Sequence, residues 1–162
     1  MERRELFSSL FPSKKEGKET KIIRPPYYKD KDSFSKECIS CEETPCITFC
    51  QENIIVLDEN HTPIIDFSKG GCTYCDECAI GCPNEVLELE HKSLIDSKFE
   101  IEMLECLSWN DTMCFSCKDP CLDDAIEFLG MFRPSINEEK CTNCGFCVSV
   151  CPTNAISIKV KG

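Results

Sequence analysis

Cysteine spacing is the feature that most constrains how this chain can fold. Sixteen of the 162 residues are cysteines, and they fall into four groups of four. The first cysteines of successive groups are 34, 34 and 35 residues apart, a regularity that is typical of an internal repeat. The groups are Cys38, Cys41, Cys46 and Cys50; Cys72, Cys75, Cys78 and Cys82; Cys106, Cys114, Cys117 and Cys121; and Cys141, Cys144, Cys147 and Cys151. The sequence therefore predicts four related units, each organised around its own cysteines.

The second and fourth groups share one motif. Both read C-x2-C-x2-C-x3-C-P and end in Cys82-Pro83 and Cys151-Pro152. This run is typical of bacterial [4Fe–4S] ferredoxins, in which three cysteines bind one cluster and the fourth binds the other cluster. The proline cannot continue a helical hydrogen-bond ladder, so the chain turns away after the last cysteine. We expect both groups to bind iron–sulfur clusters.

The first and third groups are irregular versions of this motif. The first group has an x4 gap at residues 42–45, and the third has an x7 gap at residues 107–113. Gln51 and Leu122 replace the proline, but both groups keep four cysteines and the final x3 gap. We expect them to bind clusters too, which makes four [4Fe–4S] clusters in all. The alternatives are an empty motif with structural thiols and a zinc site, because four thiolates also suit zinc.

Composition and charge exclude several classes of protein. Without its cysteines the chain is only about 31% apolar, a thin supply for the core of a short domain, so bound metal must complete the core. The net charge of −11 repels nucleic acid. There is no apolar run of about 18 residues, so we expect no membrane span.

The beginning of the chain bears on its location. Arg3-Arg4 resembles the start of a twin-arginine export signal, but the residues after Phe11 are polar and charged, so the apolar region of such a signal is missing. We therefore expect a cytoplasmic protein. In that reducing compartment, cysteines serve as metal ligands more often than as disulfides.

Hydrophobic patterns between the groups predict short strands. Residues 54–57 and 63–67 flank a polar turn, and residues 125–129 and 136 flank another, which predicts two hairpins. Residues 86–89, 99–103 and 155–160 alternate like half-buried strands. We expect an α+β fold of two tandem bacterial 2[4Fe–4S] ferredoxin-like modules with short hairpins and short helices. The modules are residues 28–95 and 96–162, preceded by a basic arm, residues 1–27, with a short amphipathic helix on Leu6, Phe7, Leu10 and Phe11.

Two pairings of the groups are open at this stage. If each module ligates its clusters internally, the first three cysteines of one group combine with the last cysteine of its neighbour. The four sets are then Cys38, Cys41, Cys46 with Cys82; Cys72, Cys75, Cys78 with Cys50; Cys106, Cys114, Cys117 with Cys151; and Cys141, Cys144, Cys147 with Cys121. The alternative is a nested pairing, of group one with group four and of group two with group three.

Finer details indicate a family. Arg3-Arg4, the segment Arg24-Pro25-Pro26-Tyr27 and the x7 gap of group three together resemble the NapF-type ferredoxins that are encoded with periplasmic nitrate reductases. The resemblance covers nearly the whole chain, although the x4 gap of group one departs from the expected x2 gap. It implies an iron–sulfur protein that binds the precursor of the nitrate reductase catalytic subunit before export and serves its maturation or electron supply. The alternatives are an electron-relay subunit of a membrane quinol or reductase complex, and a general ferredoxin.

Other residues give no sign of an enzyme. The two histidines, His61 and His91, are expected to be surface turn residues, and no phosphate-binding glycine motif is present. All sixteen cysteines are assigned as ligands, so none remains as a nucleophile. Trp109, in the insertion of group three, is expected to shield the third cluster from water.

Overall fold

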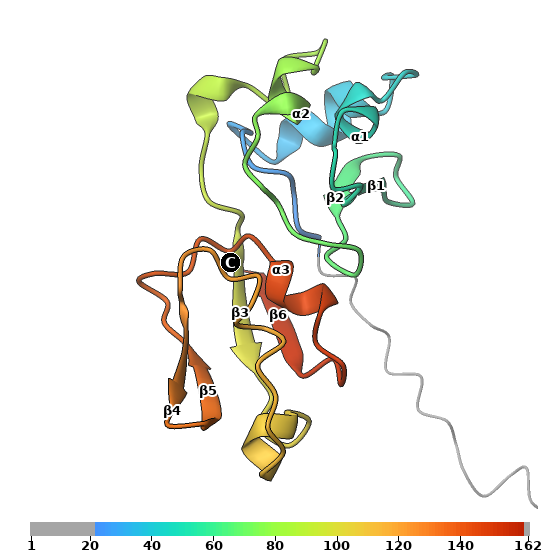
Figure 1. Cartoon of the computed structure of the whole chain (residues 1–162). Coiled ribbons are helices and arrows are strands. Elements are labelled where there is room, and N and C mark those ends of the chain that lie inside the picture. Colours follow the sequence, from blue (N-terminus) through green and yellow to red (C-terminus); the bar gives the residue numbers. More distant parts are fainter. Residues whose placement is uncertain (1–21, 161–162) are drawn as a thin grey trace, which may run out of the picture.

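The chain forms two lobes arranged end to end. The computed structural model describes residues 22–160, and Figure 1 shows the lobes one above the other. The amphipathic helix expected in the arm lies outside these residues. The first lobe contains η1 (Phe34–Cys38), α1 (Pro45–Thr48), β1 (Ile55–Leu57), β2 (Pro63–Ile65), α2 (Glu77–Ile80) and η2 (Leu89–His91). The second contains β3 (Ser97–Ile101), η3 (Leu107–Asn110), β4 (Ile126–Leu129), β5 (Phe132–Ile136), α3 (Phe146–Ser149) and β6 (Ile156–Val160).

Both predicted hairpins are confirmed. β1 pairs with β2, and β4 pairs with β5, in each case antiparallel. The side chain of Asp58 stabilises the first turn, because it accepts hydrogen bonds from the backbone N–H groups of Asn60 and Thr62 at 3.0 and 2.8 Å. The second turn uses Gly130, whose φ of +67° is easily adopted by glycine.

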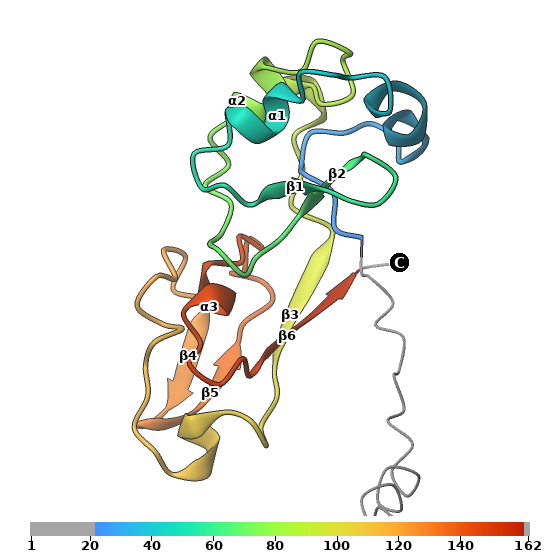
Figure 2. The ribbon, with the colours of Figure 1, turned by 90° about the vertical axis from the view of Figure 1, so that its right-hand side faces the viewer.

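The other predicted strands divide into two outcomes. β3 and β6 form an antiparallel pair in which Phe99 lies opposite Ile158 (Figure 2). In contrast, the prediction of a strand at residues 86–89 is wrong. Leu87 pairs with Tyr28 only in an isolated bridge, and Leu89 already begins a 3-10 turn. The neighbouring segment contains Pro25-Pro26, which has no backbone N–H groups to donate, and this disfavours a longer ladder.

The hydrophobic core is small and lies mainly in the first lobe and at the contact between the lobes. Phe34, Tyr27 and Ile95 are almost completely buried within it, and half-buried cysteines pack around it. Residues 23–27 belong to this packing, since Ile65 N donates to Ile23 O at 2.7 Å. The predicted division into an arm and two modules stays a prediction. Among residues 22–160, no helix is long and apolar enough to cross a membrane.

Candidate metal centres

The structure gathers the sixteen cysteines into four cavities, with four cysteines lining each cavity. We name them site A (Cys38, Cys41, Cys46, Cys82), site B (Cys50, Cys72, Cys75, Cys78), site C (Cys121, Cys141, Cys144, Cys147) and site D (Cys106, Cys114, Cys117, Cys151). In every site, three cysteines come from one group and the fourth is the last cysteine of the neighbouring group. This is the arrangement expected for pairing within each half of the chain, not for nested pairing. That these cysteines bind metal stays a prediction.

One helical turn separates the cysteines that face different cavities. In three of the groups the third cysteine lies in α1, α2 or α3, and the fourth follows two residues after the helix ends. Each helix begins after a residue with positive φ, namely Thr44, Asp76 or Gly145. Group three has turns at residues 116–120 in place of the helix. Its long insertion thus changes the local backbone, yet its cysteines still line sites C and D.

A second turn is repeated after all four groups. The residue three positions beyond the last cysteine has positive φ in every case: Asn53 (54°), Glu85 (55°), Asp124 (50°) and Asn154 (53°). In the second lobe the N–H of the next residue points to the cysteine sulfur. Ala125 N donates to Cys121 Sγ at 3.3 Å, and Ala155 N donates to Cys151 Sγ at 3.2 Å. Such N–H···S bonds favour the thiolate, which is the form that binds metal.

Burial opposes ionisation of these thiols when no metal is bound. Burial, followed by the neighbouring sulfurs of Cys82 and Cys38, raises the pKa of Cys46 to about 11. Burial and the nearby Cys72 and Cys75 raise the pKa of Cys78 to about 12. Cys46 and Cys78 therefore keep their protons at neutral pH, and a bound metal must displace these protons.

The spacing of the sulfur atoms fits a large inorganic core better than a single ion. A tetrahedral zinc ion with bonds of about 2.3 Å holds its sulfurs roughly 3.8 Å apart. Within the described chain, only Glu88, Glu90 and His91 offer three ligand atoms that all lie within 4.8 Å of one another. No set of three cysteine sulfurs is that close. The donor set therefore fits an iron–sulfur cluster, in which each cysteine binds a separate iron atom.

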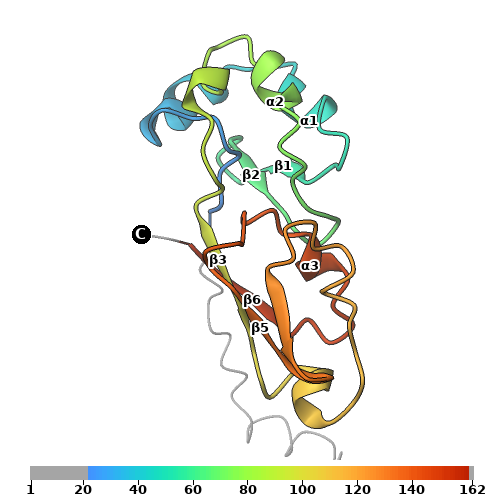
Figure 3. The same ribbon diagram turned by 60° about the vertical axis from the view of Figure 1, so that its left-hand side comes forward.

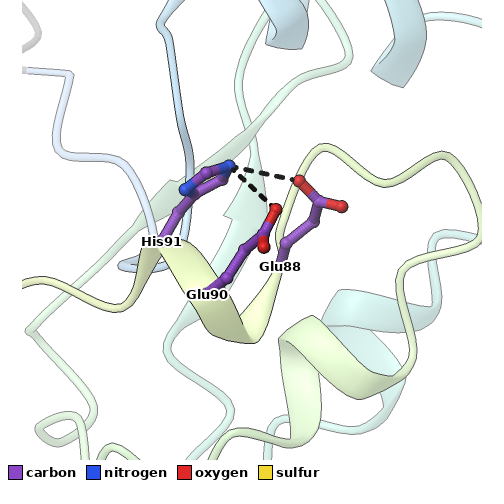
Figure 4. Close-up of side chains that lie close together, drawn as sticks. All are labelled: Glu88, Glu90 and His91. Carbon is purple, nitrogen blue, oxygen red and sulfur yellow. Dashed lines mark ion pairs between the residues drawn. The ribbon is translucent and has the colours of Figure 1, made fainter.

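The two histidines and Trp109 lie in different surroundings. His91 lies half-buried in η2, and its Nε2 is 3.3 Å from a carboxylate oxygen of Glu88 and 3.6 Å from one of Glu90; Figure 4 shows the three side chains together. His61 lies in the exposed β1–β2 turn but also lines site A. The sequence carried no signal for this contact, because it depends on how the hairpin folds over the first cysteine group.

The expectation for Trp109 is wrong. Its Nε1 donates to Pro134 O at 3.0 Å, and Arg133 lies over its ring. The indole lines a separate surface hollow beside β3 and β5 instead of a cysteine cavity. The reason is that η3 places the indole against β5, where its Nε1 is within hydrogen-bond distance of Pro134 O.

Comparisons with known proteins match this chemistry. Residues 134–157, which include the Cys141–Cys151 group, match the family model for a 4Fe-4S binding domain. The ferredoxin-type protein NapF of Escherichia coli (strain K12) is 32% identical over 139 residues, which is 83% of each chain. The chain belongs to the NapF family of ferredoxin-type proteins. NapF of Haemophilus influenzae is 31% identical over 84% of this chain and 78% of its own length. The ferredoxin-type protein NapG of E. coli is 26% identical over 85% of this chain and 69% of its own length.

Membership of the NapF family confirms several expectations from the sequence. The chain is an iron–sulfur protein of the 4Fe-4S type, and it is an electron carrier and not an enzyme. Its short helices and small antiparallel sheets are consistent with a ferredoxin-like α+β fold.

Proposed function

We propose that sites A to D each bind one [4Fe–4S] cluster and that the protein carries electrons for the periplasmic nitrate reductase system. The observation that carries this proposal is the assembly of four cysteine quartets from four repeated groups, with no cysteine left over. A bound cluster supplies one-electron redox chemistry. The chain supplies four thiolates to each cluster, together with apolar walls that limit the access of water.

The residues of the protein would also set the redox potential. Site A is walled by Leu57, Val86 and Leu87, and the last two are buried. Low polarity and the acidic body of the protein both disfavour adding an electron to an anionic cluster. The N–H···S bonds act in the opposite direction at sites C and D. We expect low potentials overall, and a titration in which all clusters reduce well above the range of bacterial ferredoxins would contradict this.

The physiological partner that we propose is the precursor of the nitrate reductase catalytic subunit, bound in the cytoplasm before export. Family membership supports this role, since relatives at 31–32% identity are NapF proteins. The protein would then deliver electrons during maturation of the precursor. Anaerobic co-purification with the tagged precursor tests this, with the folded mature subunit as the comparison. Equal or absent retention by both forms would contradict a role specific to the precursor.

Metal analysis combined with cysteine replacement tests the cluster assignment. Anaerobically purified protein should contain about 16 iron atoms per chain, because each cluster holds four. C82S should lose the same EPR signal as C38S, since both residues line site A. It should leave intact the signal that C75S removes, although Cys75 and Cys82 belong to one sequence group. If C82S resembled C75S instead, ligation across groups would be wrong.

A further inference from the structure

The two lobes meet through the backbones of two cysteine groups. Cys72 N donates a hydrogen bond of 2.7 Å to Cys144 O, although these residues lie in different lobes. Figures 1 and 3 show the loop after β2 reaching down beside α3. Cys72 lines site B and Cys144 lines site C. A candidate ligand residue of one lobe is thus hydrogen-bonded directly to a candidate ligand residue of the other.

Tyr74 reinforces this contact two residues further along the chain. Its hydroxyl donates to Thr142 O at 2.6 Å and accepts from Ile95 N at 3.2 Å. Asn143, which is buried, donates from Nδ2 to Ile95 O at 3.3 Å. The phenol therefore connects the loop of group two, the loop of group four and the segment that joins the lobes.

Two glycines allow the backbones to approach so closely. A Cβ atom at Gly71 would lie 2.5 Å from Phe146 N and 2.7 Å from Cys144 O, both backbone atoms that cannot rotate away. A Cβ atom at Gly145 would overlap the ring of Phe67. That ring also packs edge-on against Phe99 of the second lobe, with centroids 5.4 Å apart. In contrast, a Cβ atom at Gly70 would meet nothing closer than 3.5 Å.

The remaining neighbours fix the order of the sites. Sites A and B are adjacent because α1 carries Cys46 of site A and is followed by Cys50 of site B. In the same way α3 carries Cys147 of site C and is followed by Cys151 of site D. The four sites thus follow one another as A, B, C and D. The helical turns η1 and η3, which adjoin sites A and D, lie at opposite ends of the molecule in Figure 1.

We propose that this contact joins sites B and C into one continuous four-centre electron relay, with sites A and D as its two exchange ends. The inference rests on the proposed function, because it requires clusters in the four sites. Electron tunnelling weakens steeply with distance, so the short path through the Cys72–Cys144 hydrogen bond favours transfer between the lobes. Gly71 and Tyr74 are positioning residues in this relay, since the close backbone approach at Gly71 and the hydroxyl of Tyr74 hold the two loops together.

The substitution G71A tests the relay, with G70A as the matched control. The fully reduced proteins are compared by EPR, in which magnetic interaction between clusters broadens the signals and speeds their relaxation. We expect G71A to lose the part of this interaction that couples the two lobes, whereas G70A retains the wild-type spectrum. Iron and sulfide analysis of the same samples shows whether all clusters are present.

A second variant keeps the test decisive if G71A loses iron. Y74F removes the hydroxyl that bridges the lobes but keeps the ring, so it should retain full iron and show weaker coupling. If G71A and Y74F both contain full iron and both give the wild-type spectrum, the relay is overturned. If G71A is depleted of iron, a wild-type spectrum from Y74F with full iron overturns the relay on its own. Wild-type protein without about 16 iron atoms would instead count against the proposed function.

Discussion

Arg24 holds the beginning of the described chain against the first hairpin. Its Nη1 donates to Thr62 Oγ1 at 2.6 Å and to Pro63 O at 2.9 Å, and it lies 3.8 Å from Asp58 Oδ2. The guanidinium also lies 4.7 Å from the centre of the buried Phe34 ring. Burial lowers the pKa of Arg24, and the charge of Asp58 opposes this. The substitution R24M keeps the bulk of the side chain and removes all of these polar contacts.

The expected loss of stability follows from these contacts. A hydrogen bond from a charged group contributes about 1.5–3 kcal/mol, and a cation–π contact about 1 kcal/mol. Asp58 still accepts from Asn60 N, Thr62 N and Thr62 Oγ1, so R24M does not leave a bare carboxylate. We therefore expect R24M to lower the free energy of unfolding by about 3–4 kcal/mol. For a chain of this length, that lowers the midpoint of thermal unfolding by about 6–16 °C.

The assay is anaerobic thermal unfolding of the cluster-loaded protein, followed by circular dichroism and by loss of visible absorbance. Cluster loss makes unfolding irreversible, so all variants are heated at one scan rate. R133M is the matched control, because Arg133 is exposed and has one ring contact, at 5.9 Å from Trp109. We expect R133M to stay within about 1–2 °C of wild type. A midpoint for R24M equal to that of R133M would refute the reasoning.

Three further predictions concern pH, backbone geometry and metal. Hydrogen bonds from Thr62 and Asn60, together with Arg24, hold the pKa of Asp58 below its usual value although burial by itself raises it. The difference in stability between the wild-type protein and D58N should thus be constant above about pH 5 and should disappear as the pH falls through this lowered pKa. Unfolding rates measured after rapid pH jumps test this. G130A should lower the free energy of unfolding by about 1 kcal/mol, because only its positive φ is strained. G145A should lower it further in the same thermal unfolding experiments, because the new methyl group also meets Phe67. Equal costs would contradict this account. Removing iron should abolish most circular dichroism and enlarge the hydrodynamic radius, and a compact metal-free protein would show that the apolar core suffices.

Much of the local structure and of the metal chemistry could be predicted from short stretches of sequence. The C-x2-C-x2-C-x3-C-P runs predicted the cluster chemistry, and the polar turn at residues 58–60 between apolar runs predicted the first hairpin. These signals succeed because they depend on neighbouring residues: a tight loop needs cysteines at short intervals, and a hairpin needs a turn. The prediction of a strand at residues 86–89 failed for the opposite reason: a strand also needs a distant partner, and here only Tyr28 pairs with Leu87, next to Pro25-Pro26, which donates no backbone hydrogen bonds.

Contacts between distant residues were decided only by the tertiary structure. The sequence by itself determined the number of cysteines, their division into four equal groups and the family resemblance, but left tandem and nested pairing open. The folded chain places Cys38 with Cys82, and Cys72 beside Cys144, across 44 and 72 residues of sequence. It also places Arg24 on Thr62 and turns Trp109 away from the cysteines. Such contacts depend on how separate loops pack, and residue spacing along the chain carries no information about that packing.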